Sequence, residues 1–287
     1  MKKRILSCLL VLLACVGICM PGLKTEAIGK AEYDNGNASN AWNTGFIVQT
    51  PYDQSVYVEN GIEFHYVAGD TWQGMMMIVP DPSRVFVGVS RDVYDGGPGT
   101  NATRIAGKYG AILATNGTFF VDTDFHGNGG TPLGIVFSEG VCKYGAGAGA
   151  SALIGLDVNN QPVCGVMTAA QASAAGVRDA MYCKPILVQN GMMTNLSGQS
   201  LTLMDARTAI GFRADGSVLI LSVDGRSPRS IGATTRSEAE CMIAFGAVCA
   251  GNLDGGGSCG LYYAGTPINI INVFGNRATP NGFCVRP

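Results

Sequence analysis

The chain has 287 residues, of which 47% are hydrophobic and 14% are charged, and its formal net charge is −2. This composition fits one large globular domain or two small ones, and it excludes the broad positive field that a nucleic-acid or anionic-membrane partner requires. The 41 glycines indicate many turns and close backbone approaches.

The first predicted element is an export signal. A basic stretch over 2–4 precedes an uncharged apolar run over 5–20, so residues 1–27 are predicted to be a signal peptide of bacterial style. The run is short for a membrane span, so we expect no stable span in the mature protein and a secreted or cell-surface location. Two alternatives stay open: a lipoprotein anchor at Cys15, which follows the small residue Ala14, and an uncleaved anchor.

Residues 28–54, rich in Asn, Gly and Ala, are interpreted as a linker or poorly ordered arm, and 55–287 as the folded domain. From Tyr57 apolar residues alternate as in strands, and the turn Pro80–Ser83 separates two of them.

Three helices are predicted between the strands. They cover 101–110, Thr168–Ala175 with capping-box spacing, and about 237–249, which Gly251 is expected to end. Since strands outnumber helices, we expect an α+β fold: mixed, mainly antiparallel sheets with a few helices packed on them, in a single compact domain.

The cysteines do not form a metal-binding pattern. Seven of the ten remain after removal of the signal peptide, without a CxxC pair, and the chain has only two histidines. We therefore expect no zinc site, but small buried thiols with one or two disulfides.

Several apparent motifs lack the context that their chemistry needs. Residues 256–260 fit GxSxG, but no histidine follows His126, and residues 255–260 fit GxGxxG but precede a strand-like segment. "DTDFHG" begins like a calcium loop, yet its twelfth position is Leu133 instead of an acid. An irregular calcium site at Asp122 and Asp124 stays open.

Polar residues stand out at five places along the chain, and three of these polar groups end apolar strands, which is a frequent way to build a site on a rigid scaffold. These are Asn116 and Gly117 in "ATNGTFF", Arg207 in "RTAIG", Asp224 and Arg226 in "SVDGR", Asp254 in "NLDGGGS", and Arg277 in "NRATPNG". Each alone fits a turn or a surface ion pair, and only their combination points to function.

In this order, the five segments resemble the phosphodiester glycosidase family over about residues 60–287. The resemblance implies hydrolysis of the bond between a sugar anomeric carbon and a phosphodiester, which releases free sugar and a phosphomonoester. It implies a glycan or cell-wall polymer with a sugar-1-phosphodiester linkage as partner and no required cofactor, with calcium left open. Thr118 and Cys259 depart from the family pattern, so a non-catalytic glycan- or cell-envelope-binding protein is the alternative.

This reaction needs a carboxylate at the oxocarbenium-like centre and positive charge at the departing phosphate. We expect Asp254 and Asp224 as the carboxylates and His126 as a candidate proton donor. The expected substrate and phosphate ligands are Asn116, Gly117, Arg207, Arg226, Gly255, Gly256, Gly257, Ser258 and Arg277.

Overall fold

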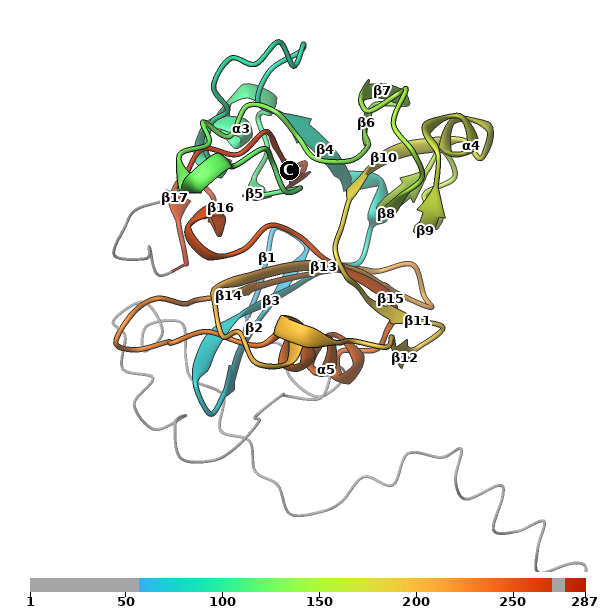
Figure 1. The fold of residues 1–287 in the computed structure, drawn as a ribbon. Helices are drawn as coiled ribbons and strands as arrows, with labels where there is room; N and C mark the ends of the chain where they lie inside the picture. The colour runs from blue at the N-terminus through green and yellow to red at the C-terminus, as the bar shows by residue number, and fades with distance from the viewer. Residues whose placement is uncertain (1–56, 270–276) are drawn as a thin grey trace, which may run out of the picture.

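The computed structural model describes residues 57–269 and 277–287 (Figure 1). The predicted signal peptide, the linker over 28–54 and the anchor alternative at Cys15 lie outside the described residues. Within the described part, the search for a helix long and apolar enough to cross a membrane finds none.

A large eight-stranded sheet forms the lower half of the molecule in Figure 1, with strand order β1-β2-β3-β14-β13-β15-β11-β12. Its ladders are antiparallel throughout. The strands are β1 (Tyr57–Glu59), β2 (Ile62–Gly69), β3 (Trp72–Val79), β11 (Ile186–Gln189), β12 (Met192–Met193), β13 (Arg207–Arg213), β14 (Val218–Val223) and β15 (Ala247–Asn252).

Two five-stranded sheets lie above it, with orders β17-β16-β5-β18-β4 and β7-β6-β10-β8-β9 (Figure 1). We call them the β5 sheet and the β8 sheet. The β5 sheet contains β4 (Val85–Val89), β5 (Leu113–Thr115), β16 (Leu261–Tyr263), β17 (Thr266–Pro267) and β18 (Asn281–Val285). The β8 sheet contains β6 (Val136–Ser138), β7 (Val141–Tyr144), β8 (Ser151–Asp157), β9 (Pro162–Met167) and β10 (Val177–Tyr182).

The predicted α+β fold is confirmed, and so are the first two predicted helices. Helix α3 (Ala102–Tyr109) begins after Asn101, whose side chain accepts from Arg104 N. Helix α4 (Ala169–Ala174) has both bonds of the predicted capping box, between Thr168 and Gln171. Short 3₁₀ turns cover Pro82–Arg84 (η2), Thr123–Phe125 (η3), Gly198–Leu201 (η4) and Gly256–Ser258 (η5).

The third helix, α5 (Thr235–Ala244), is shorter than predicted. Gly246 ends it in the left-handed region, with φ +83°. Gly251, which we expected to end the helix, lies inside β15. The predicted end was wrong because Gly246 and Gly251 both follow apolar residues. The apolar pattern of the helix continues into residues 247–250, which pair as a strand.

The large sheet separates two hydrophobic cores. Val218 and Ile220 face the core shared with the smaller sheets, whereas Leu219 and Leu221 face the core between the large sheet and α5. This alternation along β14 follows from the two-residue period of a strand. The same alternation decides whether a side chain at the end of one of these strands points toward the smaller sheets or toward α5.

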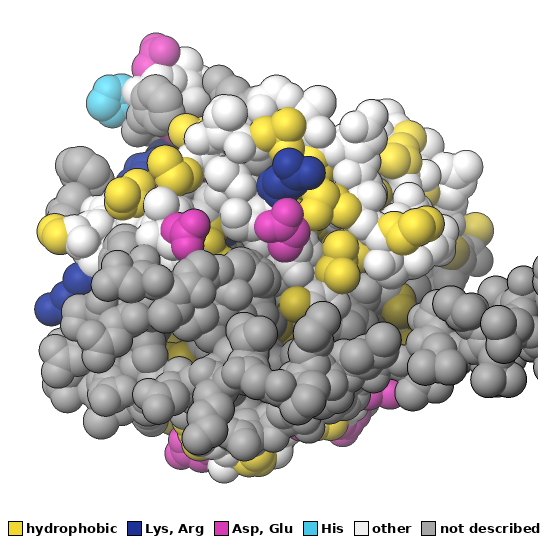
Figure 2. Space-filling view, turned by 90° about the horizontal axis from the view of Figure 1, so that it is seen from below, with side chains coloured by type: hydrophobic (Ala, Val, Ile, Leu, Met, Phe, Trp, Pro, Cys, Tyr) yellow, Lys and Arg dark blue, Asp and Glu magenta, His cyan; other side chains and the backbone are white. Residues whose placement is uncertain are grey.

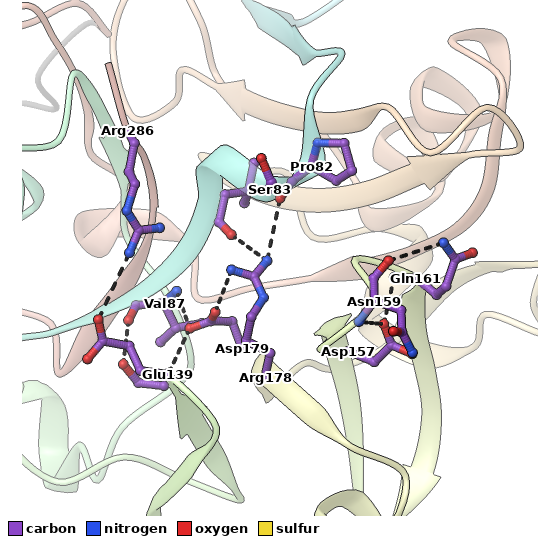
Figure 3. Close-up of polar contacts among 12 residues, drawn as sticks. Pro82, Ser83, Val87, Glu139, Asp157, Asn159, Gln161, Arg178, Asp179 and Arg286 are labelled. Atoms are coloured by element: carbon purple, nitrogen blue, oxygen red, sulfur yellow. Dashed lines mark hydrogen bonds and ion pairs between the residues drawn. The ribbon is translucent and has the colours of Figure 1, made fainter.

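Buried Asp179 joins the β8 sheet to the β5 sheet (Figure 3). Its Oδ1 accepts from Val87 N at 3.0 Å and from Glu139 N at 3.1 Å. Its neighbour Arg178 donates from Nη2 to Val85 O at 2.9 Å. Desolvation raises the pKa of Asp179 above its ordinary value, while these backbone donors lower it.

All seven cysteines in the described residues are free thiols, so the expected bridges do not form among them. Five are buried and two are half-buried, as small hydrophobic side chains would be. On the face that Figure 2 shows, the described residues mix acidic, basic and hydrophobic side chains, without a broad field of one charge.

Candidate active site

Three central strands of the large sheet bring their ends together at one edge. Arg207 at the start of β13 pairs with Val223 at the end of β14. Ala209, on the same strand, pairs with Asn252 at the end of β15. Because the ladders are antiparallel, the segments that follow β14 and β15 and the segment that precedes β13 meet at this edge.

The backbone of Asp254 is fixed by the loop that follows β5. Asp254 N donates to Gly117 O at 3.0 Å, and Asp254 O accepts from Asn116 Nδ2 at 2.7 Å. A Cβ on Gly117 would lie 2.1 Å from Asn281 Oδ1, so only glycine fits there. The large sheet and the β5 sheet therefore meet at Asp254.

Asn116 acts within the protein instead of facing a ligand. Its Oδ1 accepts from Thr208 Oγ1 at 2.7 Å and from Gly260 N at 3.3 Å, and the residue is 1% exposed. With its amide also bonded to Asp254, the side chain is a positioning group. The predicted contact of Asn116 with substrate gains no support from this geometry.

The Asp254 carboxyl lies in an environment that favours its neutral form. Burial raises its pKa to about 6, although hydrogen bonds from Ser258 and from Gly255 N and the charge of Arg277 lower it. The Gly255 N–H donates to Asp254 Oδ1 over 3.0 Å. A carboxyl with this pKa changes its charge near neutral pH, as groups that exchange protons with substrates do.

The glycines after Asp254 leave room for two arginine side chains. Gly256 has φ +60°, and a Cβ there would lie 2.4 Å from Arg226 Nη2. A Cβ on Gly257 would lie 3.1 Å from Arg277 Cδ. Arg226 itself has φ +54°, which is uncommon for a residue with a side chain. The turn therefore packs directly against Arg226 and Arg277.

Each arginine is held by a carboxylate. Arg226 donates from Nε and Nη2 to the two oxygens of Asp205, at 2.7 and 2.7 Å. Arg277 donates from Nη1 and Nη2 to the two oxygens of Asp122, at 2.6 and 2.8 Å. Among the described residues, Nη1 of Arg226 and Nε of Arg277 have no hydrogen-bond partner.

Asp205 was not among the predicted site residues, because its partner lies 21 residues away in another loop. Asp122 was predicted only as a calcium ligand, but Arg277 donates to both oxygens of that carboxylate. Asp124, the second candidate, is exposed with φ +54°. Within the described residues, no group of three or more His, Cys, Asp or Glu side chains could hold a metal ion.

Arg207 lies on the opposite side of the large sheet from the predicted ligands. Its strand neighbour two residues on, Ala209, belongs to the core between the large sheet and α5. Its Nε donates to Ala233 O at 3.0 Å and its Nη2 to Leu203 O at 2.7 Å. The guanidinium braces these loops from below and reaches within 3.8 Å of the Cβ position of Gly255.

Asp224 and His126 differ in exposure. Asp224 is 1% exposed, its backbone N donates to Gln73 O, and its carbonyl accepts from Ser230 Oγ. His126 is exposed at the end of η3, where its charged form would lower the pKa of Asp122. No hydrogen bond between described residues joins His126 to Asp254.

The two departures from the family pattern are both buried. The hydroxyl of Thr118 donates to Tyr182 O at 2.8 Å, and the residue is 0% exposed. Cys259 is 3% exposed, and its sulfur lies 3.4 Å from Thr208 Oγ1, whose proton is donated to Asn116. Because both side chains are buried, neither is exposed where a ligand could contact it.

The family model described as phosphodiester glycosidase matches residues 109–286. This span covers the Asn116 loop, both ion pairs, the Asp254 turn and β18. The chain belongs to the phosphodiester glycosidase family.

Several solved structures have folds similar to that of this phosphodiester glycosidase family member. The catalytic domain of zebrafish N-acetylglucosamine-1-phosphodiester alpha-N-acetylglucosaminidase, auto-inhibited by its pro-peptide, superposes with a TM-score of 0.63 at 21% identity, covering 85% of this chain and 89% of that one. A hypothetical protein from Synechocystis gives 0.56 at 17% identity, covering 79% and 62%. At these identities, the two matches show similarity of fold alone.

In sequence, the SPbeta prophage-derived uncharacterized protein YomE of Bacillus subtilis (strain 168) is 32% identical over 171 residues. The match covers 59% of this chain and 24% of YomE, so the chain spans about a quarter of the length of that relative.

Proposed function

We propose that this protein is an exported glycosidase that hydrolyses the bond between a sugar anomeric carbon and a phosphodiester. The products are a free sugar and a phosphomonoester. Membership of the phosphodiester glycosidase family supports the reaction class. The observation that carries the proposal is the half-buried Asp254 carboxyl, whose pKa desolvation raises to about 6, beside two arginines on a glycine turn.

Asp254 is the carboxylate that acts at the anomeric carbon. In its ionised form it either attacks this carbon, forming a glycosyl ester that water then hydrolyses to free sugar, or removes a proton from a water molecule, whose oxygen then bonds to the carbon. The bond from the carbon to the phosphate oxygen breaks, and its electron pair leaves with the phosphate. Asp224 remains the candidate for a second carboxylate and exposed His126 the candidate for a proton donor.

Arg226 and Arg277 stabilise the departing phosphate. A phosphomonoester carries a second negative charge above a pKa of about 6, so it leaves as an anion and needs cationic hydrogen-bond donors more than a proton. Arg226 Nη1 and Arg277 Nε are the donors that the two ion pairs leave available. Gly255, Gly256, Gly257 and Ser258 hold the turn against these arginines, and Arg207 supports it from the other side of the sheet.

The substrate class follows from the predicted export. A glycan or cell-wall polymer with sugar-1-phosphodiester linkages would meet a secreted or cell-surface enzyme outside the cell. One solved structure with 15% identity and a TM-score of 0.52, covering 78% of this chain, is a putative exported protein from Burkholderia pseudomallei K96243. Export of this chain remains part of the proposal.

The test is release of reducing sugar from a panel of sugar-1-phosphodiesters by the wild type and by Asp254→Asn. We expect the wild type to release sugar from at least one, and the variant to lose about 10²–10⁴-fold in turnover, as when a catalytic acid or base is removed. Circular dichroism and thermal unfolding check that the variant is folded. Full activity of the variant, or no release from the whole panel by the wild type, contradicts the proposal.

A further inference from the structure

The charges around the glycine turn do not favour a strongly anionic ligand. Three carboxylates, those of Asp254, Asp205 and Asp122, surround the guanidinium groups of Arg226 and Arg277. The charges of Asp205 and Asp254 both raise the pKa of Arg226, and those of Asp122 and Asp254 both raise the pKa of Arg277. When all five groups are ionised, the set has an excess of one negative charge. Arg207, whose Nη1 lies 3.8 Å from the Cβ position of Gly255, brings the total to zero, so the turn has no excess positive charge.

Asp205 is fixed in place more firmly than a surface ion-pair partner. Its side chain is 15% exposed, and its Oδ1 also accepts from Ala206 N at 2.9 Å. Its backbone exchanges two hydrogen bonds with Ala233, at 3.1 and 2.9 Å. The carboxylate is therefore a constant part of the site and not a mobile counter-ion.

The pair with Asp205 also restricts what Arg226 can offer a ligand. Two of its three nitrogens, Nε and Nη2, face Asp205, and Nη1 lies 3.7 Å from the Cβ position of Gly257. A free guanidinium would grip a doubly charged phosphate with a two-pronged fork. Because Asp205 occupies Nε and Nη2, Arg226 can offer a phosphate only the edge of its guanidinium that carries Nη1.

We propose that Asp205 is a specificity-determining residue, which by neutralising Arg226 makes the site accept singly charged phosphodiesters and reject doubly charged phosphomonoesters. This inference rests on the proposed function and adds to it the charge of the phosphate group. A diester carries one negative charge at neutral pH, whereas a monoester carries about −1.5 to −2. The same discrimination expels the phosphomonoester after hydrolysis, because the carboxylates repel the additional charge.

The experiment measures binding of two small probes, dimethyl phosphate and methyl phosphate, by NMR titration at pH 7.5 and fixed ionic strength. We compare the wild type with Asp205→Asn, which keeps the shape of the side chain and removes its charge. Glu240→Gln is the matched control, because it removes one carboxylate from an exposed ion pair with Arg236 on α5. Asp205→Glu tests whether a restored charge restores the preference.

We expect the wild type to bind dimethyl phosphate more tightly than methyl phosphate. In Asp205→Asn the Kd for methyl phosphate should fall about tenfold, because a nearby like charge has been removed, and the Kd for dimethyl phosphate should fall less. Asp205→Ser, which also removes the charge, is titrated in parallel in case the asparagine variant does not fold. Glu240→Gln and Asp205→Glu should keep the wild-type ratio.

The inference would be overturned if the charge-removing variants had the same ratio of the two Kd values as Glu240→Gln. A wild type that prefers methyl phosphate would overturn it as well. Because the titration requires no turnover, failure of the proposed function is seen separately, as absence of sugar release. A shifted ratio without sugar release would support the role of Asp205 while rejecting the reaction.

Discussion

Arg277 and Asp122 form a two-pronged ion pair across 155 residues of sequence, with N–O distances of 2.6 and 2.8 Å. The Arg277 backbone N–H also donates to Gly257 O at 2.9 Å, and its guanidinium lies 4.9 Å from the centre of the Phe120 ring. The pair therefore fixes Arg277 against the glycine turn and leaves Nε of the guanidinium without a hydrogen-bond partner among the described residues.

Arg277→Lys should keep the charge and lose this geometry. An ammonium group cannot donate to both Asp122 oxygens in one plane, so we expect kcat/KM for a cleaved diester to fall about 10²-fold, as for loss of one oxyanion donor. Steady-state kinetics measure the effect. Arg236→Lys, in the exposed pair on α5, should stay within about twofold of the wild type; equal losses in both variants would contradict a role specific to Arg277.

The pH dependence of activity should follow Asp254. Because the pKa of Asp254 is about 6 and its ionised form acts, kcat/KM should rise with pH through about 6 and then level off. Ser258→Ala removes a hydrogen bond that lowers this pKa, so the rising limb should move to higher pH. A limb that stays in place in Ser258→Ala, or that falls where a rise is expected, would exclude Asp254 as the titrating group.

Gly256→Ala should damage the site beyond the effect of backbone strain. The new Cβ would lie 2.4 Å from Arg226 Nη2, so Arg226 must move. Gly110→Ala is the matched control, since Gly110 has φ +61° and no atom within 4 Å of its Cβ position. Both should lose about 1 kcal/mol of unfolding free energy, but only Gly256→Ala should lose activity. Chemical denaturation and turnover assays separate the two effects.

Thr118→Ala tests whether this departure from the family pattern serves stability. The variant leaves Tyr182 O without the donor that is now 2.8 Å away, so we expect a loss of about 1–2 kcal/mol in unfolding free energy. Because Thr118 is fully buried, kcat should remain within about threefold of the wild type. A large change in kcat with unchanged stability would show that Thr118 acts in catalysis instead.

Glu238 on α5 should make stability depend on pH. It is fully buried, neither carboxylate oxygen has a hydrogen-bond partner among the described residues, and desolvation raises its pKa to about 8. Between the unfolded pKa of 4.5 and about 8, the folded state binds more protons, so stability is lost as pH rises through this window.

Glu238→Gln should remove most of that loss, on the order of 1–3 kcal/mol between pH 5 and 8. Urea unfolding at several pH values measures it, and exposed Glu240→Gln on the same helix is the control. Parallel pH profiles for the wild type and Glu238→Gln would show that the Glu238 carboxyl does not cause the dependence.

Sequence was sufficient where local chemistry decides the structure. The strands around the turn at Pro80 and the capping box of α4 follow from residues within a few positions of one another. The Asp254 turn was also recognisable, because three glycines in a row after an acid have few structural uses.

The ion pairs could not be predicted, because nothing near Asp205 or Asp122 indicates which arginine each would meet. The loops that carry them are brought together by pairing of strands far apart in the chain. The position of Arg207 could have been found, since it shares the alternation of Ala209 and therefore the α5 side of the large sheet.

Strand β18 completes the β5 sheet, because it lies between β5 and the edge strand β4. β18 pairs with both β4 and β5, and Asn281 at its start accepts from Thr118 N at 2.9 Å, next to the loop that holds Asp254. Removal of β18 would therefore release the loop that holds Asp254 together with the edge strand β4.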